Sequence, residues 1–392
     1  MVKYFKRYDF SHLSVSLILA VAALCSIGCY CIFKSDGTGL AKRQLMGIIA
    51  GLFIMAFVIL VDYHFICRFA IPLYGFAVVI LILTRFSPLG ADHSTGKFRW
   101  LDIGPTEIQP SELVKIIMII VMAVFFTRYR KKLNKWYMFF ISVAIVAVPT
   151  FLILIQTDLS SSMVCMFVFI VMIFMAGLSW KIIGTLCAVG VPLSIFLFWY
   201  IQQPYQKLLT VEQQGRVLSF LNPAESATEG AYQQLKSVQA IAAGGVIGKT
   251  LLGDNTSARQ YNYVYVNESD FIFSVIGEEL GFFGCVLVIA LFAFIVFKCV
   301  IIARKAKDLT GRLIAYGVSG MLMFQSFVNI AVATLLIPNT GLPLPFLSYG
   351  LTSLLSSIIA VSLVINVGLQ TGTRRGLSFN QGMSEDLDMD QI

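Results

Sequence analysis

The sequence predicts an all-α integral membrane protein, a polytopic bundle of about ten transmembrane helices with a large external loop. Of its 392 residues, 58% are hydrophobic and only 13% are charged, whereas a soluble domain carries about 25% charged residues. Long apolar runs recur along the chain, and a helix needs roughly 20 such residues to cross a bilayer. Because no soluble fold of this length buries so much apolar sequence, the bilayer is the expected solvent.

The apolar runs set the expected spans, and the first of them resembles a secretory signal peptide. It follows Lys3, Lys6 and Arg7, but a first transmembrane helix has the same basic flank. Because many further spans follow it, we expect a retained anchor. The runs lie near 13–33, 44–61, 69–84, 112–127, 138–155, 160–177, 183–201, 271–299, 313–337 and 350–370.

The counts of cysteine, histidine and charge argue against several classes of protein. The eight cysteines lie in or beside apolar runs, and the chain has only three histidines. A disulfide framework, a haem site or a redox metal centre is therefore not expected. The net charge of +8 is spread over short loops rather than along one stripe, which argues against nucleic-acid binding.

The basic residues indicate instead how the chain crosses the membrane. Lys and Arg gather in 128–135, in 298–312 and at the start of the tail 371–392, and cytoplasmic loops are enriched in these residues. The bases in 34–43 argue mildly the other way. We predict that both termini are cytoplasmic and that 371–392 is a cytoplasmic tail.

We expect a single membrane domain over 1–392 with two long external segments. One covers 86–111 and the other covers 202–270, and loops longer than about 12–15 residues usually carry function. The second contains Gly, Gln, Tyr and Asn with few long apolar runs. We therefore predict short interfacial helices and turns there rather than a separate domain.

Ionisable residues inside or at the edge of a membrane are costly, so each marks a candidate functional site. In 97–115 (KFRWLDIGPTEIQPSELVK), Pro110 suits the first turn of a helix and Ser111 can cap it. Glu112 and Lys115 follow at i and i+3 and can form an ion pair. The segment is either an interfacial anchor with a structural ion pair or part of a site that faces the protein interior.

Two further segments have both a structural and a functional interpretation. The turn 156–160 (QTDLS) places Asp158 before a span, where it either caps the helix or serves a site. The segment 338–350 (PNTGLPLPFLSYG) is rich in Pro and Gly. It is either a rigid turn or a re-entrant element that lines a pocket, because irregular backbone at membrane depth must be covered by protein or line a cavity.

The segment 267–281 (NESDFIFSVIGEELG) concentrates acidic residues at the start of a span. Asp270 stands where the long external loop enters that span, and either Ser269 or Asp270 could cap the helix. Glu278 and Glu279 follow about two turns later, where adjacent carboxylates have no inexpensive structural explanation. Carboxylates at a membrane surface suit general-base work on a sugar hydroxyl, or cation coordination.

The segment 244–250 (GGVIGKT) ends like a phosphate-binding P-loop. That motif needs glycine at position 243, where this chain has Ala243, and a strand before it, which is not expected here. Because its predicted side of the membrane is also external, we reject nucleotide binding.

In their order along the chain, these motifs resemble the SEDS family of bacterial shape, elongation, division and sporulation proteins, which includes RodA, FtsW and SpoVE. One departure follows the last motif, where 350–353 reads GLTS instead of the family's further glycine and paired serines. The wording TGLPLPF is closer to RodA than to FtsW. The matching stretches are RWLDIG, IQPSELVK, QTDLSS, RVLSFLNP at 216–223, the GG-x-x-GK turn, DFIFSVIGEELGFFG and TGLPLPFLSYG.

The resemblance implies a peptidoglycan glycosyltransferase that polymerises lipid II at the outer face of the bacterial cytoplasmic membrane, for cell elongation or shape. Lipid II is a disaccharide-pentapeptide on undecaprenyl diphosphate. Asp270 matches the family's acidic residue before FIF, and it would be the general base for the 4-hydroxyl of the acceptor sugar. The departing lipid diphosphate needs cations, for which Arg99, Lys115 and Arg216 are the candidates.

The resemblance also implies supporting roles for other residues. Glu112 would orient Lys115, Asp158 would hold the acceptor sugar or a metal ion, and Ser348 and Tyr349 would line the lipid groove. No organic cofactor is expected, whereas a divalent cation, Mg²⁺ or Mn²⁺, would add positive charge at the diphosphate.

The implied partners are lipid II, membrane lipids and a class B penicillin-binding protein, a transpeptidase; no nucleic acid is expected. Two other functions compete with polymerisation. A lipid II flippase or other transporter would use Glu278, Glu279 and Lys115 along a path through the bundle, although no inverted repeat is evident. A non-enzymatic scaffold for the transpeptidase is the second alternative.

Overall fold

The computed structural model describes most of the chain between the basic N-terminal flank and the C-terminal tail. The predicted tail therefore lies outside the described residues beyond position 371. The described residues are 13–87, 90–91, 98–102, 107–203, 205–208, 211–221, 229–252 and 269–371.

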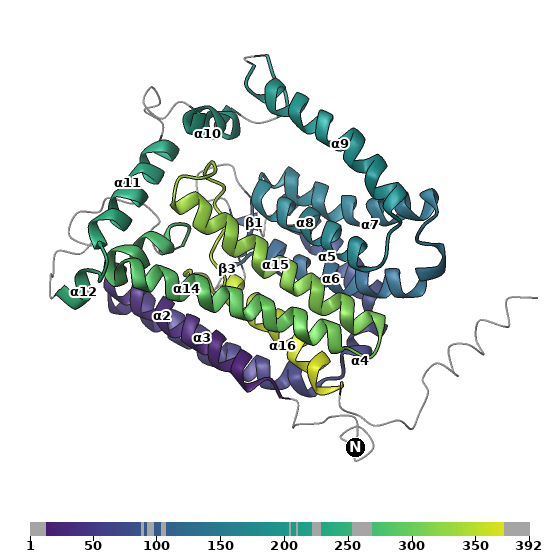
Figure 1. Ribbon diagram of the computed structural model, residues 1–392, viewed down its shortest axis with the longest axis horizontal. Coiled ribbons are helices and arrows are strands. Elements are labelled where there is room, and N and C mark those ends of the chain that lie inside the picture. The colour runs from purple at the N-terminus through teal and green to yellow at the C-terminus, as the bar shows by residue number, and fades with distance from the viewer. Residues whose placement is uncertain are drawn as a thin grey trace, which may run out of the picture.

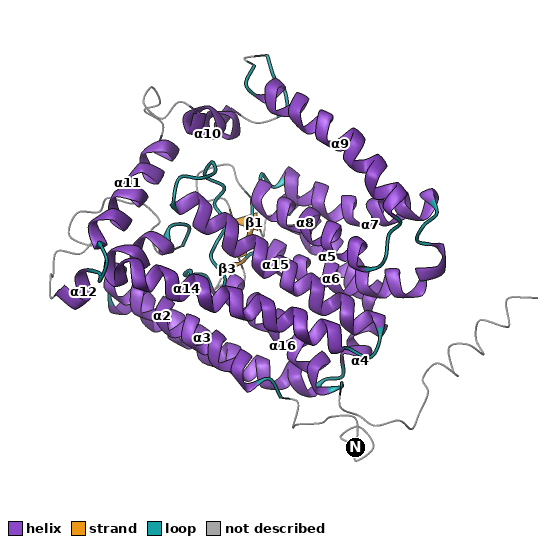
Figure 2. Ribbon diagram, viewed as in Figure 1, coloured by secondary structure: helices purple, strands orange, loops and turns teal. Residues whose placement is uncertain are grey.

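Helices dominate the described residues, as Figure 2 shows, and the apolar ones among them confirm the expected number of spans. Eight of them are long and apolar enough to cross a bilayer, and two more are apolar but shorter. The eight are α2 (Val15–Asp36), α3 (Thr38–Leu60), α6 (Pro110–Arg128), α7 (Trp136–Ile155), α9 (Trp180–Ile201), α14 (Ile272–Lys305), α15 (Leu309–Ala333) and α16 (Leu351–Leu369), and the two are α5 (Ala70–Phe86) and α8 (Leu159–Met175).

Short elements occupy the described parts of the two long loops. The helices predicted in 202–270 are confirmed there, whereas a small antiparallel sheet with the strand order β1-β2-β3 lies in 86–111, where none was predicted. A further short helix and a 3-10 turn connect spans elsewhere. These elements are α10 (Val211–Leu221), α11 (Glu229–Gly244), α12 (Lys249–Leu252), β1 (Gly90–Ala91), β2 (Trp100–Asp102), β3 (Glu107–Ile108), α4 (Tyr63–Arg68) and η2 (Arg130–Lys132).

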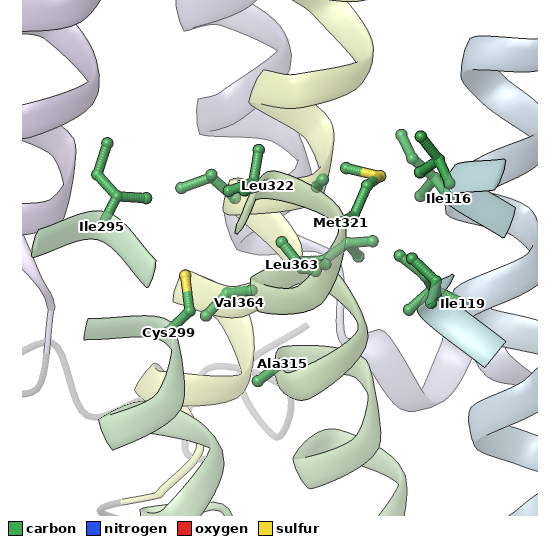
Figure 3. Packing of buried hydrophobic residues seen from close by; sticks show 14 of the residues in the cluster. Ile116, Ile119, Ile295, Cys299, Ala315, Met321, Leu322, Leu363 and Val364 are labelled. Atoms are coloured by element: carbon green, nitrogen blue, oxygen red, sulfur yellow. The ribbon is translucent and has the colours of Figure 1, made fainter. Parts of the chain in front are cut away.

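Helix α15 lies at the centre of the bundle, against α14, α8, α6 and α16 (Figure 1). Its glycines permit this close approach: a Cβ on Gly317 would lie 2.9 Å from Ile119 Cγ2, and one on Gly320 would lie 3.3 Å from the side chain of Val171. Figure 3 shows some of the buried apolar side chains of α6, α14, α15 and α16. Because lipid tails are as apolar as leucine, such contacts hold membrane helices together through packing rather than through exclusion of water.

The bundle has two ends that differ in composition, and the helix bounds assign each loop to one of them. We term them the Asp270 end and the basic end. The Asp270 end contains 98–102, 107–112, 156–160, 269–272 and 338–350, and the basic end contains 61–69, 128–135, 304–312 and 366–371.

Candidate active site

Asp270 lies in the turn that leads into α14, and its side chain is half-buried. The hydroxyl of Ser269 donates to Asp270 Oδ1 at 3.3 Å. Neither residue caps the helix, because Phe271 is the N-cap and has no side-chain hydrogen bond there; capping by Ser269 or Asp270 is therefore wrong. A Cβ placed on Gly341 would lie 3.3 Å from Asp270 Oδ2, so the carboxylate faces the 338–350 segment.

The 338–350 segment is irregular backbone between α15 and α16, and much of it is buried. Its apolar side chains Leu344, Phe346 and Leu347 are at most 1% exposed. Protein therefore covers it, as irregular backbone at membrane depth requires. A substrate pocket beside it stays a prediction, as does a lipid-lining role for Tyr349, which is half-buried against the core.

Two side chains hold the backbone on either side of Asp270. The hydroxyl of Ser348 donates to the Ser269 carbonyl at 2.5 Å and accepts from the Leu344 amide at 2.8 Å. Asn329 of α15 donates through Nδ2 to the Asp270 carbonyl at 2.8 Å and to the Leu342 carbonyl at 2.6 Å. Ser348 was predicted from the sequence and Asn329 was not, although a polar amide in an apolar helix is itself a signal of a functional or structural role.

Asp158 caps α8, and this confirms the structural interpretation of its turn. Its Oδ1 accepts from the Ser161 amide at 3.1 Å, while Oδ2 accepts from Gln109 Nε2 at 3.2 Å and from Ser111 Oγ at 3.1 Å. The predicted capping of α6 by Ser111 is wrong, because Gln109 is the N-cap and Ser111 turns to this carboxylate. Asp158 is only 4% exposed; its role toward an acceptor sugar or a metal stays a prediction.

Arg99 and Ser160 connect the Asp158 turn to its surroundings. The guanidinium of Arg99 donates to the carbonyls of Gln156, at 3.4 Å through Nε, and Thr157. The hydroxyl of Ser160 donates to the carbonyl of Thr340, next to the glycine that faces Asp270. The 338–350 segment thus contacts both acidic turns.

Glu112 and Lys115 form the predicted ion pair inside the bundle. Lys115 Nζ lies 2.7 Å from Glu112 Oε1, and the two side chains are only 1% and 2% exposed. Ser356 of α16 donates to Glu112 Oε2 at 3.2 Å. The pair therefore faces the protein interior, as expected, and lies away from the surface of the bundle.

Glu278 and Glu279 each have a partner that the sequence analysis missed. Lys249 donates to Glu278 Oε1, and Thr250 Oγ1 donates to Glu279 Oε2 at 2.6 Å. Tyr30 of α2 in turn donates to Thr250 Oγ1 at 3.1 Å. The P-loop-like segment 244–250 thus supplies partners for two buried carboxylates.

Glycines allow this segment to lie directly on α14. Gly281 interrupts α14 with a φ of +67°, and a Cβ there would lie 2.4 Å from the Gly248 nitrogen. The break exposes amides that the segment satisfies, because Phe282 N donates to the Gly245 carbonyl at 3.0 Å. The glycines of the motif therefore serve close helix packing.

Asp270 is more exposed than Glu112, Asp158, Glu278 and Glu279. The side chains of these four residues are all 2–4% exposed. Asp270 is half-buried and lies where the chain enters the bundle. Of these five carboxylates, Asp270 is therefore the most accessible. Arg216 lies on α10, and its side chain falls outside what the structure describes.

The family model for the FtsW, RodA and SpoVE cell cycle proteins matches residues 9–372. The chain belongs to this family. Among curated relatives, a probable peptidoglycan glycosyltransferase FtsW from Geobacter sulfurreducens is 32% identical over 377 residues, which cover 93% of this chain and 96% of that protein. Stage V sporulation protein E from Bacillus subtilis is 34% identical over 333 residues, which cover 85% of this chain and 87% of that protein.

Solved structures of this SEDS family share the fold. A chain from a peptidoglycan synthase complex, described as coordinating polymerization and crosslinking, has a TM-score of 0.75 at 27% identity and covers 94% of this chain and 99% of its own. The rod shape determining protein RodA of Thermus thermophilus has a TM-score of 0.64 at 25% identity, with 92% and 96% covered. Because FtsW, SpoVE and RodA all match, the closer likeness to RodA stays a prediction.

A second cluster of polar side chains lies at the basic end of the bundle, and it was not predicted from the sequence. His64 Nδ1 lies 2.9 Å from Asp62 Oδ1, and His64 Nε2 lies 3.6 Å from Asp308 Oδ2. Tyr63 donates to Asp308 at 2.5 Å, and Gln370 donates to Asp62 at 3.1 Å. Burial disfavours the imidazolium, but the hydrogen bonds to Asp308 and Asp62 outweigh it and raise the pKa of His64 to about 9.

Proposed function

We propose that this protein polymerises lipid II into glycan strands at the outer face of the bacterial cytoplasmic membrane, with Asp270 as the general base. The observation that carries the proposal is the setting of Asp270: a half-buried carboxylate at the entrance to a span, beside a covered irregular segment. The named activity of the FtsW relatives, peptidoglycan glycosyltransferase, supports it. A base of this kind typically contributes about 10²- to 10⁴-fold to a rate.

The proposed reaction exchanges one bond for another at the anomeric carbon of the donor. Asp270 takes the proton of the acceptor's 4-hydroxyl as that oxygen forms a bond to the donor's anomeric carbon. The bond from this carbon to the phosphate oxygen breaks, and the lipid diphosphate leaves with the electron pair. The proton moves to the Asp270 carboxylate, so charge and atoms balance.

Negative charge grows on the leaving diphosphate, and we propose that Arg99 and Arg216 meet it. For Lys115, the proposal requires that its ammonium leaves Glu112 when the diphosphate enters, since the two side chains are buried as a pair. This requirement applies to Lys115 and not to Arg99 or Arg216. Replacing both Lys115 and Glu112 tests it.

A divalent cation, Mg²⁺ or Mn²⁺, fits this proposal only with help from the substrate. The described residues contain no group of three His, Cys, Asp or Glu side chains placed to hold a metal. Mg²⁺ is commonly bound by one or two carboxylates together with substrate phosphates, and Asp270 is a carboxylate of the required kind. When bound, the ion would supply positive charge at the diphosphate.

We also propose an orientation and a partner. The basic segments lie at the end opposite Asp270, and cytoplasmic loops are enriched in Lys and Arg; both termini are then cytoplasmic and Asp270 faces outward. The match to a chain from a peptidoglycan synthase complex supports a class B penicillin-binding protein as partner. Labelling of single introduced cysteines in intact cells tests the orientation, and co-purification tests the partner.

The test is polymerisation of lipid II by the purified protein in proteoliposomes, with and without a chelator. Glycan chains should form with the wild-type protein and fail to form with Asp270→Asn. Equal activity in that variant would remove Asp270 from the mechanism. Transfer of lipid II across the bilayer without polymer would support a transporter, and growth of cells that carry only Asp270→Asn would support a scaffold.

A further inference from the structure

The peptide carbonyls on both sides of the Asp270 Cα accept hydrogen bonds from side chains of other elements. Ser348 donates to the carbonyl of Ser269, and Asn329 donates to the carbonyl of Asp270 itself, at 2.5 and 2.8 Å. These carbonyls belong to a turn and not to the regular part of α14. The turn therefore depends on these two donors for its shape.

Asn329 ties this turn to a second piece of irregular backbone. Its Nδ2 also donates to the carbonyl of Leu342 at 2.6 Å, one residue beyond the glycine that faces Asp270. Gly341 itself has a φ of +70°, in the region that favours glycine. One amide group thus fixes both the carboxylate's own backbone and the backbone that the carboxylate faces.

The orientation of the Asn329 amide is well determined by its surroundings. The side chain is only 1% exposed. Both hydrogen-bond partners of its amide are carbonyl oxygens, and a carbonyl oxygen can accept a hydrogen bond from the NH₂ group but not from Oδ1. In the described part of the chain, Asn329 Oδ1 has no hydrogen-bond partner. Burying an acceptor such as Asn329 Oδ1 without a hydrogen-bond partner lowers stability. Asn329 therefore holds the two carbonyls at some cost to the stability of the fold.

We infer that Asn329 is a positioning residue for Asp270 and that Ser348 assists it. The inference rests on the proposed role of Asp270 as general base. A base must lie within about 2.6–3.2 Å of the proton that it removes, and a misplacement of about 1 Å can cost about a hundredfold in rate. Loss of the Asn329 amide would free the turn and lower the rate of the chemical step without removing the base.

The experiment measures lipid II polymerisation by full-length Asn329→Ala in proteoliposomes. We expect kcat to fall about 10- to 100-fold while KM stays within about twofold, because geometry rather than binding is lost. The matched control is Asn366→Ala. Asn366 is an equally buried asparagine that donates to three backbone carbonyls at the basic end, and its loss should leave kcat within about threefold of wild type.

A double-mutant cycle with Asp270→Glu separates positioning from a general loss of structure. The longer carboxylate should lower kcat in the wild-type and Asn366→Ala backgrounds by the same factor. It should lower kcat much less in Asn329→Ala, where the geometry is already lost. Equal factors in all three backgrounds, or a kcat for Asn329→Ala similar to that of Asn366→Ala, would overturn the inference.

Two further variants keep the inference testable if Asn329→Ala does not fold. Ser348→Ala releases the carbonyl of Ser269 and should also lower kcat more than KM changes; a wild-type kcat would overturn the inference. The control one turn away is Ser326→Ala, because among the described residues the Ser326 hydroxyl donates only to carbonyls of its own helix. An active Asp270→Asn would reject Asp270 as the general base, whereas an inactive Asp270→Asn with a fully active Asn329→Ala would reject only the positioning role. Absence of polymer with the wild-type protein would reject the proposed function itself.

Discussion

Asn329 at the Asp270 end and Asn366 at the basic end are both buried asparagines whose amides donate to backbone carbonyls. Asn366 donates to Val58, Ile59 and Val61, and so completes the C-terminus of α3. Its Oδ1 also accepts, from the Tyr63 amide at 3.2 Å and from Gln370 at 3.0 Å. Every hydrogen-bonding atom of its side chain is thus engaged in joining elements.

Asn329 instead joins irregular backbone around a half-buried carboxylate and leaves its own oxygen without a partner among the described residues. At the basic end His64 lies between the carboxylates of Asp62 and Asp308, whereas Asp270 is a half-buried carboxylate at the entrance to a span. We infer that the basic end is arranged for stability and the Asp270 end for chemistry, since activity and stability often make opposing demands on a site. The following changes test this contrast, in order of their expected effect on stability.

Lys115→Met should have the largest effect, a loss of about 3–5 kcal/mol, because it leaves the buried Glu112 carboxylate without its counter-charge. Unfolding in mixed detergent micelles measures it. Adding Glu112→Gln should recover most of the loss. If Lys115→Met were as stable as wild type, the Glu112–Lys115 ion pair would not be structural. The polymerisation rate of the double variant shows whether Lys115 also stabilises the leaving diphosphate.

Gly281→Ala tests the contact between α14 and the segment 244–250. The added Cβ would lie 2.4 Å from the Gly248 nitrogen at a φ of +67°, so we expect a loss of about 1–3 kcal/mol or more. Gly75→Ala is the control, since nothing lies within 4 Å of its Cβ position. That helical substitution should raise stability by about 0.5–1 kcal/mol. Equal melting temperatures for the two variants would contradict the assigned packing.

Much of the fold was predictable because its signals are local. Apolar runs gave the spans, the i, i+3 spacing gave the Glu112–Lys115 pair, and the residue type and position of Asp158 gave a helix cap. The strands β1 to β3 were missed because elements of two or three residues leave no periodicity to detect. The capping of α6 by Ser111 failed because Asp158, 47 residues away, competes for the hydroxyl.

The rest of the candidate site depends on contacts between distant parts of the chain. Glu278 and Glu279 find partners 29 residues away, and Asn329 meets Asp270 across 59 residues. No spacing rule links such positions. Only the packing of α12, α14 and α15 brings them together. The sequence therefore identified most of the charged residues of the site and Ser348, but not Thr250 or Asn329.

Asn366→Ala should lower stability by about 1–3 kcal/mol, since it leaves buried carbonyls of α3 unsatisfied. Its effect on polymerisation should be small. Thermal unfolding and lipid II turnover measured on one preparation check both statements. If Asn366→Ala lost polymerisation activity but kept the wild-type melting temperature, the basic end would serve chemistry rather than stability, contrary to our inference.

A shift in pH should affect the basic end through His64. Its pKa is raised to about 9 from about 6.5 in the unfolded chain. The stabilisation from its positive charge is therefore fully present below about pH 6.5 and is lost as the pH rises toward 9. The melting temperature should fall over that range in wild type and change less in His64→Gln. If the melting temperatures of wild type and His64→Gln changed identically with pH, protonated His64 would not stabilise the basic end.

The stabilisation from the carboxylates of Asp62 and Asp308 has the opposite dependence on pH. Burial opposes their ionisation, but hydrogen bonds from His64 hold the pKa of each below its usual value. Their contribution is present above the unfolded value of about 3.9 and is lost as the pH falls below it. The basic end should therefore be most stable between about pH 4 and 6.5.

We expect chemistry to depend on Asp270 and stability to depend on Asp62 and Asp308 at the opposite end. Asp270→Asn and Asp62→Asn make the same chemical change at the two ends and can be compared in one assay of melting temperature and lipid II polymerisation. We predict that Asp270→Asn abolishes polymer formation and keeps the wild-type melting temperature, while Asp62→Asn lowers the melting temperature and retains polymerisation. Polymer formation by Asp270→Asn at the wild-type rate would contradict the account.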